Sequence, residues 1–329
     1  MISRDAHLVA GPFGELEQKA CRAGFGDALA ALGEDDENIV VLTGDLAEST
    51  KVDGFRDRFG DRFFEAGVAE QNMMGIAAGL ALAGKIPFLS SYATFSPGRS
   101  WDQFRVSVAY TGANVKVAGA HAGLSVGPDG ATHQALEDIA ITRVLPGVTV
   151  VVPCDYHETI KATRAIAARQ GPAYLRFGRT TTPVFTTPDS PFQIGRAEIL
   201  RDGGDLAIVA CGPLVYEALL AARDLHGEGI EARVINSHTI KPLDIATLTA
   251  AARETGGIVT VEEHQIHGGL GGAVAEALAA HHPAPVEMVA MPDHFGESGP
   301  PGELLAKWGL TAPSIADAAH RVLTRKAGR

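Results

Sequence analysis

Cysteine is scarce in this sequence, and its scarcity excludes two kinds of small-protein architecture. The three cysteines, Cys21, Cys154 and Cys211, lie far apart and form no CxxC pair. Neither a disulfide framework nor a cysteine-based zinc site is therefore expected. Each cysteine stands among apolar residues, so we interpret all three as buried, unreactive thiols.

Long apolar runs and an excess of positive charge are lacking as well. No stretch approaches the ~20 apolar residues that a membrane-spanning helix needs, and the first residues contain no apolar run of secretory type. The net charge of −11 disfavours nucleic acid or an anionic membrane as the main partner. We therefore expect a cytoplasmic protein that binds neither nucleic acid nor membrane.

Aromatic residues make up only 6% of the chain, whereas 46% of it is hydrophobic and 38 residues are glycine. Small residues permit close helix–sheet packing and loops that press backbone against a ligand. The 329 residues suffice for one large domain or two ordinary ones.

Short apolar runs alternate with helical patterns after the first 18 residues, which we interpret as an N-terminal arm. The predicted buried strands are Ile39–Thr43, Ile86–Ser90, Val115–Ala118 and Val148–Val152. The predicted helices are Glu70–Ala83, Arg99–Tyr110, Ala135–Val144 and Tyr156–Ala168. This alternation predicts a doubly wound, mostly parallel α/β sheet over residues 19–180.

A proline-containing segment separates this domain from a second one. Residues 181–195 include Pro183, Pro188 and Pro191 among threonines, a composition typical of an extended linker. Further strands are predicted at Leu206–Ala210, Ala232–Asn236, Gly257–Val261 and Val286–Ala290. Residues 196–329 are therefore predicted to form a second, smaller α/β domain.

One acid stands at the start of an apolar helix. Glu70 precedes a run rich in alanine and glycine, and its flanking residues are almost all apolar. An acid in the first turn of a helix is often simply an exposed carboxylate favoured by the helix dipole. Among apolar neighbours, however, a carboxylate can share a proton with a ligand nitrogen.

Aromatic residues follow the second predicted strand. Phe95 and Trp101 flank a Pro-Gly turn, and Tyr92 lies just before them. These rings could stack on a flat heterocycle, or they could pack in the core as isolated aromatic pairs usually do.

A glycine-rich loop with two imidazoles and a carboxylate follows the third predicted strand. His121, Asp129 and His133 lie between that strand and a predicted helix, at the carboxyl edge of the sheet where ligands of open α/β folds bind. Such side chains suit proton transfer and hydrogen bonding to hydroxyl groups. The glycines favour close approach of a substrate over a metal site.

These three stretches resemble, in order and approximate spacing, the pyrimidine-domain motifs of the transketolase family. The resemblance covers roughly residues 18–325 and is closest to the separately encoded C-terminal subunits of split transketolases. It implies a thiamine-diphosphate pyrimidine-binding fold followed by a transketolase C-terminal domain. The second half continues it with the segments Thr239–Asp244, Val261–His264, Gly268–Gly272 and Phe295–Gly299.

The resemblance also implies roles for individual residues. Glu70 corresponds to the glutamate that hydrogen-bonds N1′ of the cofactor's aminopyrimidine, and it is expected to be catalytic together with His121 and His133. Further cofactor contacts are implied for Asp45, Tyr92, Phe95 and Trp101. Substrate contacts are implied for Arg22, Ser49, His121, Asp129, His133 and Arg179.

Some of these positions depart from the family pattern or carry an alternative interpretation. Trp101 stands where the family often has tyrosine, and Gly98 stands where it often has another aromatic residue. Arg22 and Arg179 suit bidentate binding of a terminal phosphate, although both could be ordinary surface arginines. We interpret Arg176 as structural.

The diphosphate-binding segment of this family is lacking here. That segment is a Gly-Asp-Gly motif with an asparagine-rich end further along, and the sequence contains no such pair. The resemblance therefore implies a partner, the N-terminal transketolase subunit, that supplies the diphosphate domain and its Mg²⁺ or Ca²⁺. It also implies an α2β2 assembly, self-association through the pyrimidine domain, and sugar phosphates as substrates.

Three other interpretations of the sequence remain open at this stage. The beta subunit of a 2-oxo acid dehydrogenase shares the two-domain layout, and a deoxyxylulose-phosphate synthase carries related domains on one chain. A non-catalytic regulatory subunit would have no need of an acid at Glu70. The sequence does not identify the donor and acceptor sugars.

Overall fold

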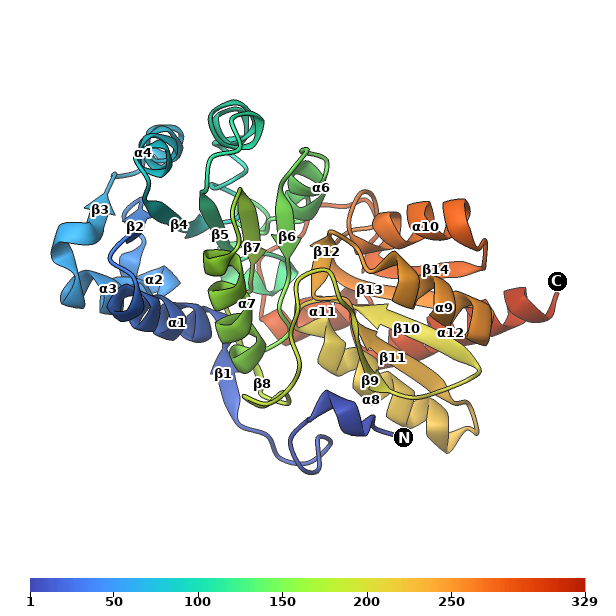
Figure 1. The fold of residues 1–329 in the computed structure, drawn as a ribbon. Coiled ribbons are helices and arrows are strands. Elements are labelled where there is room, and N and C mark those ends of the chain that lie inside the picture. The colour runs from blue at the N-terminus through green and yellow to red at the C-terminus, as the bar shows by residue number, and fades with distance from the viewer. Residues whose placement is uncertain (329) are drawn as a thin grey trace.

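The computed structural model describes residues 1–328 and contains two α/β units side by side (Figure 1). The first unit is built on a seven-stranded sheet with the order β12-β6-β7-β5-β4-β2-β3. Its strands are β2 (Ile39–Thr43), β3 (Phe63–Glu65), β4 (Ile86–Tyr92), β5 (Lys116–Ala120), β6 (Thr149–Val151), β7 (Ala173–Arg176) and β12 (Thr239–Lys241). All neighbours pair in parallel except β12, which is antiparallel to β6.

Helices cover both faces of this sheet, which explains why two of its central strands are buried along their whole length. Every residue of β2 and of β5 is buried, as expected of parallel strands with helices on each side. One face carries α1 (Cys21–Asp35), α3 (Asp53–Arg58) and α7 (Tyr156–Ala168). The other carries α4 (Glu70–Leu82), α5 (Trp101–Gln103) with η3 (Phe104–Tyr110), and α6 (Asp138–Arg143).

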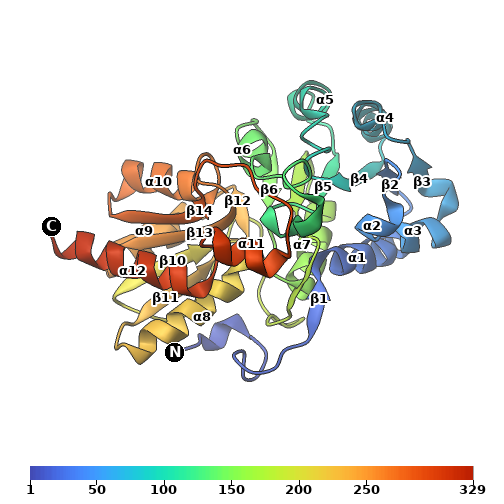
Figure 2. The same ribbon diagram turned by 180° about the vertical axis from the view of Figure 1, so that it is seen from behind.

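The second unit has a five-stranded sheet with the order β14-β13-β10-β11-β9. Its strands are β9 (Glu198–Arg201), β10 (Leu206–Ala210), β11 (Ala232–Asn236), β13 (Ile258–Gln265) and β14 (Val286–Met291), of which only β9 is antiparallel to its neighbour. Its helices are α8 (Leu214–Gly227), α9 (Ile245–Thr255), α10 (Leu270–His281), α11 (Pro301–Lys307) and α12 (Ala312–Ala327). Helices α8 and α12 cover one face and α9 and α10 the other (Figure 2).

The two units share apolar contacts and one strand. Strand β12 comes from the second half of the chain but closes the edge of the first sheet. A single apolar cluster combines Val150 of β6 and Tyr174 of β7 with Ile235, Leu248 and Leu270 of the second unit. The arm and the connecting segment also meet, since β1 (Gln18–Ala20) pairs antiparallel with β8 (Thr181–Pro183). We propose a division of the chain at 1–18, 19–180, 181–195 and 196–329.

Most predicted elements are present, and two of the predicted helices begin later than predicted. The second predicted helix begins at Trp101 and has π-helical geometry from Phe104 onward. The third predicted helix begins only at Asp138. Residue Ala135 before it forms an extended bridge to Ala122, and its carbonyl accepts a hydrogen bond from the Gly123 amide. Short elements complete the chain, namely η1 (Arg4–Ala6), α2 (Ala47–Thr50), η2 (Gly60–Arg62) and η4 (Leu124–Asp129), of which η4 is kinked at Gly127.

Within residues 1–328, no helix combines the length and apolarity that crossing a membrane requires. The three cysteines are all buried and free, as predicted. Burial raises the pKa of the Cys21 thiol to about 12, so this thiol stays protonated and unreactive at neutral pH.

Candidate active site

Glu70 begins α4 and is buried, with only 2% of its surface exposed. The turn before it is fixed by Glu65, whose carboxylate accepts the Asp45 amide at 2.7 Å and the Gly67 amide at 2.9 Å. Glu70 itself accepts a hydrogen bond at Oε2 from the Arg99 guanidinium at 3.0 Å. A buried carboxylate needs such a partner, so the exposed first-turn acid considered from sequence is not what the structure contains.

Four rings gather next to this pair, at the carboxyl ends of β4 and β5. Tyr92 stacks on His121 with ring centroids 3.9 Å apart and on Phe95 at 5.7 Å with the planes 15° apart. His133 meets Phe95 edge-on at 5.3 Å and Tyr92 at 6.2 Å. The Arg99 guanidinium lies 4.5 Å from the Phe95 ring centre, which links the ring cluster to Glu70.

Trp101 occupies a different environment from Phe95. Its indole N–H donates to the Ile141 carbonyl in α6 at 2.7 Å, and the ring packs against the large apolar cluster beneath α4. The structure thus brings Tyr92 and Phe95 to the imidazoles and places Trp101 in the helix layer behind them.

His121 combines burial with an uncommon backbone conformation. It is 1% exposed and has a φ of 52°, in the left-handed region. Burial, reinforced by the positive charges of Arg22 and Arg179, lowers the pKa of His121 to about 3. Its Nδ1 atom is buried and has no hydrogen-bond partner among the described residues. The site therefore contains a buried, neutral imidazole with one nitrogen that no described residue pairs with.

The loop after β5 carries the remaining predicted sugar contacts. We call residues 121–133 the His121 loop; Gly123, Gly127 and Gly130 in it have φ between 75° and 89°. Asp129 lies on its exposed side and accepts a long contact from Arg179 at 3.5 Å. His133 closes the loop, and its Nδ1 lies 2.9 Å from the Thr132 hydroxyl.

Arg22 and Arg179 bring two positive charges close to this loop. The Arg22 guanidinium donates to the Ser49 carbonyl at 2.7 Å, and Arg179 donates to the Val126 carbonyl at 3.0 Å. Burial lowers the pKa of Arg22, and the neighbouring charge of Arg179 lowers it further. Two repelling guanidinium groups next to an imidazole form a site suited to an anion.

Asp45 and Ser49 lie on the segment that follows β2. Asp45 has a φ of 62° and is exposed. With Ser49, Arg56 and Glu65 it lines a surface cavity of about 200 Å³. Ser49 therefore contacts one arginine of the proposed anion site, because its carbonyl accepts from Arg22. Asp45 lines the neighbouring surface cavity.

Arg176 is buried and structural, as interpreted from sequence. Its Nε atom donates to Asp138 at 2.7 Å, and Tyr174 donates to the same carboxylate oxygen at 2.6 Å. Burial alone would lower the pKa of Arg176, but the Asp138 carboxylate outweighs it and raises that pKa. Arg176 stays charged and ties β7 to α6.

Among residues 1–328, no group of three or more His, Cys, Asp or Glu side chains is arranged to hold a metal ion.

Two family descriptions match this chain. The description "Transketolase, pyrimidine binding domain" matches residues 17–184, and "Transketolase, C-terminal domain" matches residues 195–315. The chain belongs to the transketolase family. The predicted family and the predicted two-domain α/β fold are thereby confirmed.

Several relatives in the transketolase family are subunits of similar size. The chain is 42% identical to the 6-deoxy-6-sulfo-D-fructose transketolase subunit of Clostridium sp. (strain MSTE9), over 95% of this chain and 97% of that one. It is 41% identical to one of the subunits of the apulose-4-phosphate transketolase of Phocaeicola vulgatus, over 90% of this chain and 95% of that one.

Solved transketolase structures agree with this picture. A split-gene transketolase described as an inactive β4 tetramer superposes with a TM-score of 0.87 at 44% identity, covering 94% of this chain and 100% of that one. The transketolase of Campylobacter jejuni has a TM-score of 0.78 at 20% identity, over 92% of this chain and 46% of that one. The second comparison supports the shared fold.

Sequence reasoning missed three residues that shape this candidate site. Arg99 pairs with Glu70, Gln134 crosslinks the His121 loop, and Glu263 reaches that loop from the second unit. Arg99 stands between Phe95 and Trp101, and a cation among the aromatic residues was a signal that could have been read. Glu263 gave no local signal, because it lies 138 residues from its partner Ser125.

Proposed function

We propose that this chain is the pyrimidine-binding subunit of a thiamine-diphosphate-dependent transketolase that transfers a two-carbon ketol unit from a ketose to an aldose. The observation that carries the proposal is the buried carboxylate of Glu70 next to a ring cluster. Membership of the transketolase family and the similarity to named transketolase subunits support it.

The residues present fit the pyrimidine half of the cofactor. Arg99 engages Oε2 of Glu70, and a carboxyl group has a second oxygen with which to meet a ring nitrogen. Tyr92 and Phe95 are nearly parallel and offer a flat apolar surface. The imidazole of His121 stacks on Tyr92 at one side of that surface.

When bound, thiamine diphosphate supplies an electron sink for breaking and forming the bond next to a carbonyl carbon. Glu70 holds or releases a proton at the pyrimidine N1′. His121, being neutral, can either donate to or accept from a sugar oxygen. Asp129 accepts from a hydroxyl group, and His133 adds a further imidazole next to the reacting oxygens.

We also propose that activity requires a partner subunit carrying the diphosphate domain and its Mg²⁺ or Ca²⁺, in an α2β2 assembly. The lack of a metal-binding cluster within residues 1–328 supports this, as does the similar split-gene subunit described as an inactive tetramer of one chain type. Self-association of the chain is proposed at α4, where Ile76 and Leu82 are exposed.

Replacing Glu70 by glutamine tests the proposal. The amide keeps the shape and a hydrogen-bonding oxygen but cannot exchange a proton, so turnover in the complex reconstituted with the N-terminal subunit should fall at least ~100-fold. Assembly, measured by sedimentation, should not change. Glu34→Gln, which alters an exposed carboxylate on α1, is the control. Undiminished turnover in Glu70→Gln would overturn the assignment.

The substrate class is a separate part of the proposal. We propose phosphorylated sugars, because Arg22 and Arg179 form a cationic pair. Arg22→Met should raise KM for a phosphorylated acceptor about 10- to 100-fold and leave an unphosphorylated acceptor almost unaffected, as expected for loss of a charge-assisted contact. Arg164→Met, at an exposed arginine on α7, provides the control. Equal efficiency of the wild type with both acceptors would refute the phosphate preference.

A further inference from the structure

The His121 loop is attached to the second unit by side chains that the proposed chemistry does not use. Glu263, in β13, accepts the backbone N–H of Ser125 at Oε1. Gln134 donates to the Leu124 carbonyl at 3.1 Å and to the Glu297 carbonyl at 2.9 Å. These contacts join the proposed sugar-binding loop to a unit that contributes none of the predicted site residues.

Glu263 lies unusually close to the loop backbone. It is 3% exposed, and a Cβ atom at Gly123 would lie only 2.5 Å from its Cδ. Gly123 also has a φ of 89°, so only glycine allows both the conformation and the approach. Glu263 therefore contacts the His121 loop at Gly123 and Ser125, directly after His121.

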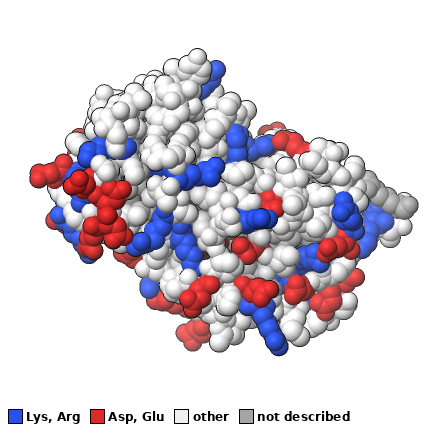
Figure 3. Space-filling view, in the orientation of Figure 1, with Lys and Arg blue, Asp and Glu red and all other residues white. Residues whose placement is uncertain are grey.

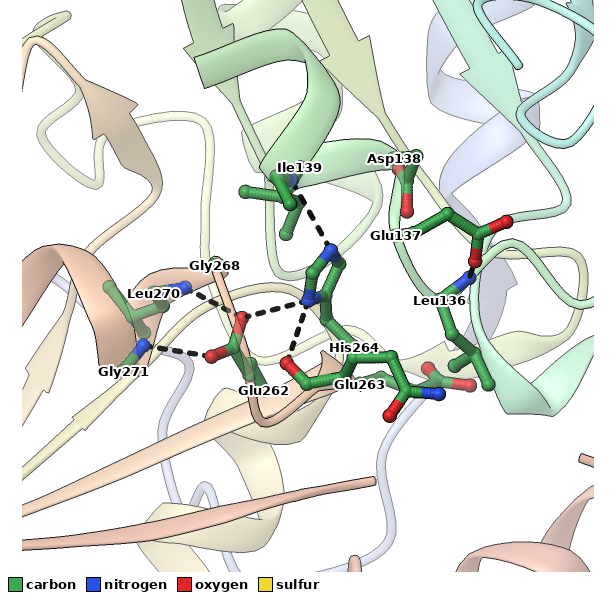
Figure 4. Close-up of polar contacts among 12 residues, drawn as sticks. Leu136, Glu137, Asp138, Ile139, Glu262, Glu263, His264, Gly268, Leu270 and Gly271 are labelled. Carbon is green, nitrogen blue, oxygen red and sulfur yellow. Dashed lines mark hydrogen bonds and ion pairs between the residues drawn. The ribbon is translucent and has the colours of Figure 1, made fainter. Parts of the chain in front are cut away.

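Glu262 and Glu263 are neighbours in β13, but their side chains point to opposite faces of the strand and bind different backbone amides. Glu262 points towards the start of α10, where it accepts the Leu270 amide at 2.7 Å and the Gly271 amide at 2.8 Å (Figure 4). Glu263 points to the other face, as the alternation of a strand requires. The Arg176 guanidinium fixes this stretch by donating to the Glu263 carbonyl at 2.7 Å.

The space behind the loop is incompletely filled. A cavity of about 200 Å³ is lined by Ser125, Glu263, Thr181, Leu214 and Leu305. The loop has a further contact on the second unit, because the Ser298 hydroxyl donates to the Pro128 carbonyl at 2.6 Å. Glu263 adds a buried acceptor for the Ser125 amide, and a buried amide left without a partner is costly.

We propose that Glu263 is a positioning residue that holds the His121 loop, and with it His121 and Asp129, in the geometry used for sugar binding. The second unit then helps to set the shape of the proposed sugar-binding site although it contains none of the predicted site residues. The link to sugar binding rests on the proposed function; the link to the loop does not.

The first test measures amide hydrogen exchange in the isolated full-length chain. Glu263→Ala should speed exchange of the Ser125 amide at least tenfold and leave the Leu270 and Gly271 amides unchanged. Glu262→Ala is the matched control, because it removes a neighbouring buried glutamate and should give the reverse pattern. Unchanged exchange at Ser125, or the same pattern in both variants, would overturn the proposal.

The second test measures kinetics of the reconstituted enzyme. Glu263→Ala should raise KM for the sugar acceptor at least fivefold with a smaller change in kcat, and Glu263→Gln, which keeps an oxygen acceptor, should recover most of the loss. Equal KM in Glu263→Ala and wild type would refute the role in sugar binding. A wild-type complex without ketol transfer would instead refute the proposed function, and the exchange result would still decide the contact with the loop.

Discussion

At the scale of single residues, the site contains two buried ionisable groups with different partners. Glu70 and His121 are almost fully buried, and each is accommodated differently. Glu70 has a cationic partner in Arg99, whereas His121 faces two arginines and remains neutral. Burial of a charge is tolerated only where it is paired. The site therefore combines one paired acid with one neutral imidazole.

This difference predicts how His121 titrates. Because burial and the nearby arginines lower the pKa of His121 to about 3, its ring should remain neutral between about pH 5 and pH 8. The ¹⁵N shifts of the ring, assigned by comparison with His121→Asn, should not move over this range, while free imidazole in the same sample titrates as usual. A His121 titration near the ordinary histidine value of about 6.5 would contradict the prediction.

Particular residues show what sequence could and could not predict. The apolar neighbours of Glu70 in sequence suggested an enclosed carboxylate but left an exposed one open. The rule for open α/β folds placed the His121 loop at the carboxyl edge of the sheet, but it did not predict the contact of His121 with Tyr92. The hydrogen bond from Trp101 to Ile141 spans 40 residues, and nothing local favours it over contact with Phe95. Glu263 was missed because sequence periodicity does not show which loop a strand faces.

At the scale of elements, α4 has apolar residues that the chain leaves uncovered. From Met73 onward this helix is apolar on all sides, a property of helices that are buried all round. Yet Ile76 and Leu82 are exposed on it, and Val106 and Tyr110 are exposed on the adjoining η3. Few charged residues lie over this part of the molecule (Figure 3). An uncharged apolar face of this kind is typical of a surface that another chain covers.

A charge placed on this face should weaken self-association. Leu82 is 73% exposed, so Leu82→Glu should fold normally and raise the Kd of self-association at least tenfold, about 1.4 kcal/mol. Sedimentation equilibrium of the isolated chain measures this, with thermal melting as a check on folding. Ile245→Glu places the same charge on an exposed residue of α9 and should have no effect. Identical association in both variants would refute the interface.

At the scale of the whole molecule, the two units form one body. Strand β12 lies in the first sheet, and the large apolar cluster takes residues from both units. The predicted division near residue 190 follows the change in composition along the chain, but this sharing is invisible in composition. The three residues Thr239–Lys241 are too short a run to be assigned to a sheet from pattern alone.

Removing the second unit should therefore destabilise the first. Residues 1–195 alone would leave β6 without its edge partner and expose Val150 and Tyr174, which pack against Ile235 and Leu270. We expect this fragment to aggregate or to bind a hydrophobic dye strongly, whereas the full chain does not. Gel filtration and dye fluorescence measure both. A monomeric fragment that melts cooperatively within ~5 °C of the full chain would contradict this.

The position of β12 also has a consequence for synthesis of the chain. The first sheet remains one strand short until residue 241 has left the ribosome, although its other strands are all made by residue 176. At ~5–20 residues per second, this delay lasts several seconds. During that time the edge of β6 is open to pairing with another nascent chain. A bound chaperone would be most useful to this protein in that interval.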